Sequence, residues 1–133
     1  LVTSLAAIHI LGENYRFTTE YGFNKRTGNL YIKGFGDPMF ISEVIQMFCR
    51  DLISNLKIKK IHDIVLDHSY FADRIQIPGQ SDTANPYDAP VGALCANFNT
   101  IAFDSDTAAG QFISAEPQTP LLPVFEKIIK KTG

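Results

Sequence analysis

One amphipathic pattern limits the folds open to this chain more than any other feature. Between Ile41 and Leu56, apolar residues recur every three or four positions, which places their side chains on one face of an α-helix. An apolar stripe of about four turns must be covered by another element. The pattern therefore predicts a helix over 41–56 that supplies much of the core, with Phe48 and Cys49 on its apolar stripe.

The segments around this helix predict short strands and two further helices. Residues 15–23 and 29–35 are typical of strands, and the intervening Asn24–Gly28 is typical of a turn, so the two strands should pair as an antiparallel hairpin. Further strands are expected over 61–67, 97–103 and 111–114, helices over 1–11 and after Pro123, and a long loop over 78–90. The predicted fold class is α+β, with antiparallel strands packed with two or three helices.

Composition excludes several classes of function. The chain has 133 residues, of which 45% are hydrophobic and 20% charged, and its formal net charge at pH 7 is -2. These values are typical of a soluble globular protein, and the basic residues form no stripe for nucleic acid. No apolar run reaches the ~20 residues that a membrane-spanning helix needs. A chain of this length needs no disulfide or metal to fold. No cofactor is predicted.

Neither the cysteines nor the histidines predict a reactive or metal-binding site. Cys49 and Cys95 lie in apolar stretches, where a cysteine usually acts as a small buried hydrophobe, although a bridge between them stays open. His62 and His68 flank two aspartates. On an extended strand these two histidines would lie roughly 20 Å apart, too far to share one ion by themselves.

Two short matches suggest a penicillin-recognising serine enzyme, and both are interpreted as coincidences. Residues 54–57 fit Ser-x-x-Lys and residues 131–133 read Lys-Thr-Gly. An acylating serine belongs at a helix N-terminus, whereas Ser54 falls near the end of the predicted helix. Lys-Thr-Gly belongs on a strand, whereas here it ends a helical pattern. The middle motif, Ser-x-Asn or Tyr-x-Asn, occurs nowhere, so no catalytic residue is predicted in this chain.

Five other segments follow one another in an informative order. They are 1–19, 28–38 with its Gly-Asp-Pro turn, 61–71 with Asp-x-Ser-x-Phe, 78–94 with Pro-Gly and Tyr-x-Ala-Pro-x-x-Ala-Leu, and 97–99 with Asn-x-Asn. In this order they resemble the low-molecular-mass class C penicillin-binding proteins, the D-Ala-D-Ala carboxypeptidases and endopeptidases of bacterial cell walls. The resemblance covers about residues 1 to 103.

The resemblance implies an arrangement of domains. Residues 1–14 would be one helix of the penicillin-binding catalytic domain, and 15–133 would be the α+β domain inserted into that transpeptidase-like fold, with its C-terminal connection. Ser-x-x-Lys would directly precede Leu1, and the other catalytic motifs would follow Gly133. The chain alone is then expected to be an inactive internal fragment whose first helix lacks its native partners and self-associates or packs elsewhere.

The resemblance also implies a function for the parent enzyme. It would be a periplasmic or extracytoplasmic serine hydrolase that binds β-lactams and trims peptidoglycan stem peptides. The alternative is a non-catalytic module that binds cell-wall peptide or a protein partner, and a third possibility is a homologue that keeps the fold but has lost the serine. A Ser-x-x-Lys motif immediately upstream of Leu1 distinguishes the enzyme from the module.

One substrate-binding role transfers to a matching position. In the family, an aspartate between Pro-Gly and the Tyr-x-Ala-Pro run helps to read the polar end of a diaminopimelate-type side chain. Counted back from Ala89-Pro90, that position is Asp82. A carboxylate suits a substrate ammonium group. The alternative is an aspartate that only caps a loop turn, and this chain lacks the tryptophan that the family commonly has in the loop.

Overall fold

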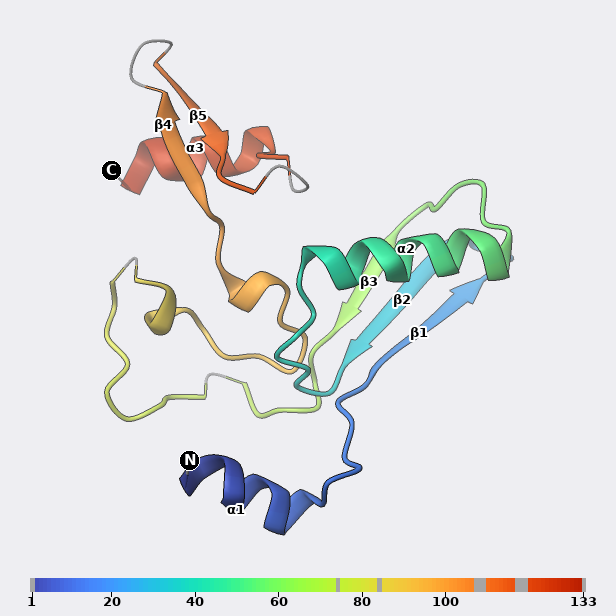
Figure 1. The fold of residues 1–133 in the computed structure, drawn as a ribbon. Helices are drawn as coiled ribbons and strands as arrows, with labels where there is room; N and C mark the ends of the chain where they lie inside the picture. The colour runs from blue at the N-terminus through green and yellow to red at the C-terminus, as the bar shows by residue number, and fades with distance from the viewer. Residues whose placement is uncertain (1, 74, 84, 107–109, 117–119, 133) are drawn as a thin grey trace.

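The chain combines helices with two small sheets, and its computed structural model describes residues 2–73, 75–83, 85–106, 110–116 and 120–132. The three-stranded sheet β1-β2-β3 carries α2 on one face, and the β4–β5 hairpin lies beside α3 (Figure 1). The predicted α+β class is confirmed. In chain order the elements are α1 (Val2–Leu11), β1 (Thr19–Asn24), β2 (Asn29–Gly34), α2 (Ser42–Leu56), β3 (Ile64–Asp67), η1 (Pro86–Asp88), η2 (Asn97–Asn99), β4 (Phe103–Asp106), β5 (Gln111–Ser114) and α3 (Pro123–Thr132).

The three-stranded sheet begins with the predicted hairpin. β1 and β2 pair antiparallel, with Phe23 opposite Leu30, and the Asn24 side-chain oxygen accepts backbone N–H groups within the turn. β3 then joins β2 in parallel, with Leu30 opposite Ile64. The antiparallel prediction does not extend to this strand, because α2 crosses over between β2 and β3 and the chain returns in the same direction.

Helix α2 packs on the sheet as its apolar pattern predicts. Leu52 faces the sheet and is buried, together with Leu30 of β2 and Phe40 before the helix. The ring of Phe48 lies 5.1 Å from that of Tyr21 and 5.9 Å from that of Phe40, measured between centroids. A cavity of about 290 Å³ with a lining of apolar side chains remains between α2 and the sheet. This region forms a small core of its own.

The sequence overestimated the burial of two residues on the α2 stripe. Phe48 is half-buried and Cys49 is exposed, because the short strands beneath α2 cover only part of a wide stripe. Cys95 is half-buried, and burial raises the pKa of its thiol. Both cysteines are free, so the bridge that the sequence left open is not formed.

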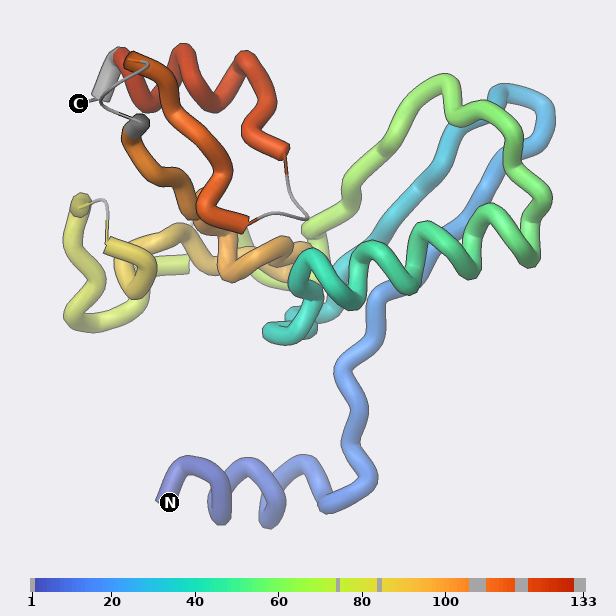
Figure 2. The backbone as a smooth tube through the Cα atoms, turned by 45° about the horizontal axis from the view of Figure 1, so that its top comes forward, coloured from blue at the N-terminus to red at the C-terminus, as the bar shows by residue number. Residues whose placement is uncertain are grey.

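Helix α1 lies apart from the sheet, at the end of an irregular connection over 12–18 (Figure 2). It forms as predicted, and Gly12 ends it with φ 85°. All its described residues are exposed, with Val2 at 83% and Ile10 at 76% of their full accessibility. The helix is apolar on nearly every side, a composition that usually belongs to a helix surrounded by other elements.

The strand predicted over 97–103 is wrong. Asn97, Phe98 and Asn99 have φ values of 47°, 59° and 54°, in the left-handed region that excludes a strand. Of the predicted range only Phe103 belongs to a strand, β4, where it lies opposite Ser114 of β5. The strand predicted over 111–114 and the final helix are confirmed.

Several contacts attach the irregular segment over 68–102 to the region of the sheet and α2, among them a bond from the Asn97 N–H to the carbonyl of Phe40 over 3.2 Å. The Gly36 N–H donates to the carbonyl of Ala93 over 2.7 Å, and Ala93 is fully buried. A Cβ on Gly34 would lie 2.2 Å from the same carbonyl oxygen, so only glycine fits there. The Asn97 Oδ1 accepts the N–H of Ser42 over 2.8 Å, in the first turn of α2, where backbone N–H groups have no carbonyl partner within the helix.

Candidate functional site

A cavity of about 360 Å³ lies between the loop that carries Asp82 and the segment 99–102. Asp82 and Thr83 line one side, together with Asp88 from η1, and Asn99 and its neighbours line the other. Asp82 is exposed. The residue that the resemblance selected therefore borders a cavity, and none of the described residues that line this cavity is basic.

The buried carboxylate of Asp88 holds this loop in shape. Asp88 is 7% exposed, and its Oδ1 accepts the backbone N–H of Ser81 over 2.7 Å. Its Oδ2 accepts the hydroxyl of Thr83. These two donors, the Thr83 hydroxyl first, hold the pKa of Asp88 below its usual value, because both bonds favour the ionised form. The Asp88 carbonyl also accepts the side-chain amide of Gln80 over 2.9 Å.

The opposite wall of the cavity is fixed by its own hydrogen bonds. The Asn99 side chain donates to the carbonyl of Pro90 over 2.8 Å, and the Thr100 hydroxyl donates to the carbonyl of Asn97 over 2.7 Å. These bonds support the left-handed backbone of this segment. The cavity therefore has an exposed carboxylate on one side and amide and hydroxyl groups on the other. These groups suit a polar ligand with a positive charge.

The two catalytic-looking matches fall at the ends of helices, as the sequence predicts. Ser54 is exposed, and its hydroxyl donates to the carbonyl of Arg50 over 2.8 Å in the last turn of α2. Lys57 follows the helix with φ 49°. Lys131 and Thr132 belong to α3, and Gly133 lies outside the described residues. Ser54 is therefore far from the free amides that an acylating serine needs at a helix N-terminus.

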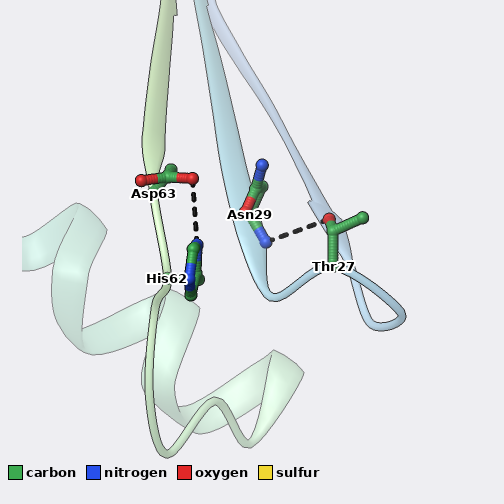
Figure 3. A network of polar contacts seen from close by, with 4 residues as sticks. All are labelled: Thr27, Asn29, His62 and Asp63. Carbon is green, nitrogen blue, oxygen red and sulfur yellow. Dashed lines mark hydrogen bonds and ion pairs between the residues drawn. The ribbon is translucent and has the colours of Figure 1, made fainter.

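The histidines form no metal centre. His62 lies before β3, and its Nδ1 is 2.9 Å from the Asp63 carboxylate (Figure 3). Nearby, the Asn29 N–H donates to the Thr27 hydroxyl. The His68 Nδ1 lies 3.9 Å from Asp73, and both side chains are exposed. Within the described residues, no group of three His, Cys, Asp or Glu side chains could hold a metal ion.

Sequence reasoning missed Asp88 and Asn99. Asp88 occupies the variable position of Tyr-x-Ala-Pro, and Asn99 is the last residue of Asn-x-Asn. Neither motif assigned a role to these two residues. The available signal was local: Ser81 and Thr83 are short polar residues close in sequence to an aspartate, a combination typical of side-chain-to-backbone bonds in loops.

Comparison with known proteins identifies the family. The family described as D-Ala-D-Ala carboxypeptidase 3 (S13) matches residues 1–130, a range that includes β4, β5 and most of α3. No curated protein matches the chain. Among the helices of the described residues, none has the length and apolar character needed to cross a membrane. The match extends over nearly the whole sequence, and the chain therefore belongs to the D-Ala-D-Ala carboxypeptidase 3 (S13) family.

Proposed function

We propose that this chain helps to select peptidoglycan stem peptides in a serine-type D-Ala-D-Ala carboxypeptidase. The family match over residues 1–130 carries this proposal. In such an enzyme the catalytic serine is acylated by the penultimate D-Ala carbonyl, the terminal D-Ala leaves, and water deacylates the serine. β-Lactams would acylate the same serine. The substrate lies outside the cytoplasm, so we place the enzyme in the periplasm or a comparable compartment.

We also propose that residues 1–14 belong to the catalytic domain and residues 15–133 to a domain inserted into it. The exposure of α1 supports this division, because an apolar helix of this kind normally packs among others. The sheet and α2 support it as well, because they share buried residues of their own. A binding module whose apolar α1 docks on a protein partner is the second candidate, and the same exposed helix favours it.

The acylated serine is proposed to lie outside residues 1–133. Ser54 is the single serine here with a lysine three positions later, and its hydroxyl is bonded to the end of a helix. We expect no stable labelling of this chain by a fluorescent penicillin, as measured on a denaturing gel. Labelling that survives in Ser4→Ala but disappears in Ser54→Ala would overturn this part of the proposal.

Asp82 is proposed to bind the ammonium group at the end of a diaminopimelate-type side chain. Its position at the cavity and its exposed carboxylate support this role. Because Asp82 is exposed, water screens the pair, and we expect a contribution of about 0.5 kcal/mol to 1 kcal/mol, the range of surface ion pairs. This value corresponds to roughly a two- to five-fold change in affinity.

The test compares two synthetic stem peptides that differ only at the end of that side chain, where diaminopimelate has an ammonium and a carboxylate group and norleucine has a methyl group. One carries diaminopimelate, and the matched peptide carries norleucine at the same position. Their dissociation constants are measured by following backbone amide signals of the isotope-labelled chain. We expect the charged peptide to bind more tightly, shifts in the 80–90 loop, and loss of the preference in Asp82→Asn. Equal binding of both peptides, or shifts confined to α1, would favour the second candidate instead.

A further inference from the structure

The residues on both sides of Asp82 are bonded to one buried carboxylate. Ser81 donates its backbone N–H to Asp88 Oδ1 over 2.7 Å, and Thr83 donates its hydroxyl to Asp88 Oδ2. Asp88 is therefore bonded both to the residue before Asp82 and to the residue after it. Asp82 itself makes no hydrogen bond or ion pair with the described residues, so its exposed carboxylate stays available to a ligand.

Asp88 is poorly placed to bind a ligand itself. Only 7% of it is exposed, and each of its carboxylate oxygens already accepts a bond from within the loop. A ligand ammonium at Asp88 would have to displace one of these donors. The influence of Asp88 on binding must therefore pass through the loop that it holds.

Thr83 extends the same arrangement toward η1. Its hydroxyl oxygen accepts the backbone N–H of Asn85 over 3.1 Å and the Asn85 side-chain amide over 2.8 Å. On the other side of Asp82, the side-chain amide of Gln80 donates to the carbonyls of Asp88 and Ala89, over 2.9 Å and 3.1 Å. Both arms of the loop are thus tied to the segment that contains Asp88.

We propose that Asp88 is a positioning residue that fixes the backbone on both sides of Asp82 and thereby sets the selectivity of the cavity for ligands with an ammonium group. The proposal rests on the proposed function of Asp82. A carboxylate on a fixed loop loses less conformational freedom on binding than one on a flexible loop. Without Asp88, Asp82 keeps its charge but no longer holds it at the mouth of the cavity.

The experiment measures a selectivity ratio in the 133-residue chain. The ratio is the dissociation constant of the norleucine stem peptide divided by that of the diaminopimelate stem peptide. We expect a ratio of roughly two to five for the unchanged chain and about one for Asp82→Asn. Asp88→Ala should lower the ratio toward one. The double variant with Asp82→Asn and Asp88→Ala should have the same ratio as Asp82→Asn alone, because Asp88 acts through Asp82.

Two variants separate position from charge and from general stability. Asp88→Asn removes the charge but keeps an oxygen that accepts the Ser81 N–H, so it should recover part of the ratio. An Asp88→Asn ratio equal to that of Asp88→Ala would mean that the charge acts directly, and would overturn the proposal. Asp51→Ala, which removes an exposed carboxylate on α2, should leave the ratio unchanged.

The remaining outcomes distinguish this proposal from the function on which it rests. If Asp88→Ala weakens both peptides equally, Asp88 is only structural and the proposal fails, while the role of Asp82 stands. If Asp88→Ala does not fold, Thr83→Val decides in its place, because it removes one of the two bonds and should lower the ratio. An unchanged ratio in Thr83→Val overturns the proposal. If the chain without substitutions binds both peptides with equal affinity, the roles proposed for Asp82 and for Asp88 are both overturned.

Discussion

Helices α1 and α2 are both rich in leucine and isoleucine, yet only α2 packs within the chain. α2 has one apolar face, and the sheet beneath that face buries Leu52. α1 is apolar on nearly every side, and its described residues are all exposed. The difference shows that the arrangement of apolar residues determines how a helix is covered. A one-sided stripe is satisfied by one neighbouring layer, whereas an apolar cylinder needs neighbours around it.

The strongest test of this comparison lies within α2. Leu52 is 4% exposed, whereas its neighbour Ile53 is 62% exposed. Leu52→Ala should lower the free energy of unfolding by about 2 kcal/mol to 4 kcal/mol, because it empties a buried site. Ile53→Ala is the control and should change it by no more than about 0.5 kcal/mol. Urea denaturation measures both, and equal shifts would show that α2 does not pack by one face.

The start of α2 gives a smaller effect. Asn97 accepts the Ser42 N–H at the first turn of this helix, so Asn97→Gly should cost about 1 kcal/mol by loss of that cap. Asn97→Ala should cost roughly 1 kcal/mol more, because alanine resists the φ of 47° at this position. Urea denaturation separates the two. If alanine and glycine cost the same, the left-handed backbone at 97 is not required.

Helix α1 should give the smallest effect on stability. Leu5 is 63% exposed, so Leu5→Ser should change the free energy of unfolding by less than about 0.5 kcal/mol. The same substitution should weaken any self-association through α1, because it removes apolar surface. Sedimentation velocity at rising protein concentration measures this property. A stability loss above about 1 kcal/mol would show that α1 packs on the rest of the chain.

Local patterns predicted the elements well and their surroundings less well. The hairpin over 15–35 and the α2 stripe depend on turn residues and periodicity, which are properties of neighbouring residues. The direction of β3 depends on where α2 returns the chain, and no residue in 61–67 encodes it. The alternation over 97–103 was misleading because Asn97 and Asn99 adopt a left-handed backbone. The exposure of Cys49 follows from the size of the sheet beneath it.

The candidate site divides in the same way. Asp82 was selected by its position relative to Ala89-Pro90, and it lines a cavity, while its role in binding stays a prediction. Asp88 carries no signal of this kind, because its importance comes from burial and from bonds to Ser81 and Thr83. Burial of one carboxylate among several in a loop is decided by how the loop folds, and a single sequence does not reveal it.

The contact between Gly34 and Ala93 has a consequence for the order in which the chain folds. The bond from Gly36 to Ala93 joins residues that enclose α2, β3 and most of the irregular segment. Closing so long a loop costs more entropy than forming a hairpin, so the β1–β2 hairpin should form early and this closure late. A side chain at position 34 would block the closure. We therefore expect Gly34→Ala to yield a chain that acquires its hairpin at a normal rate and stalls before the cavity beside Asp82 is built.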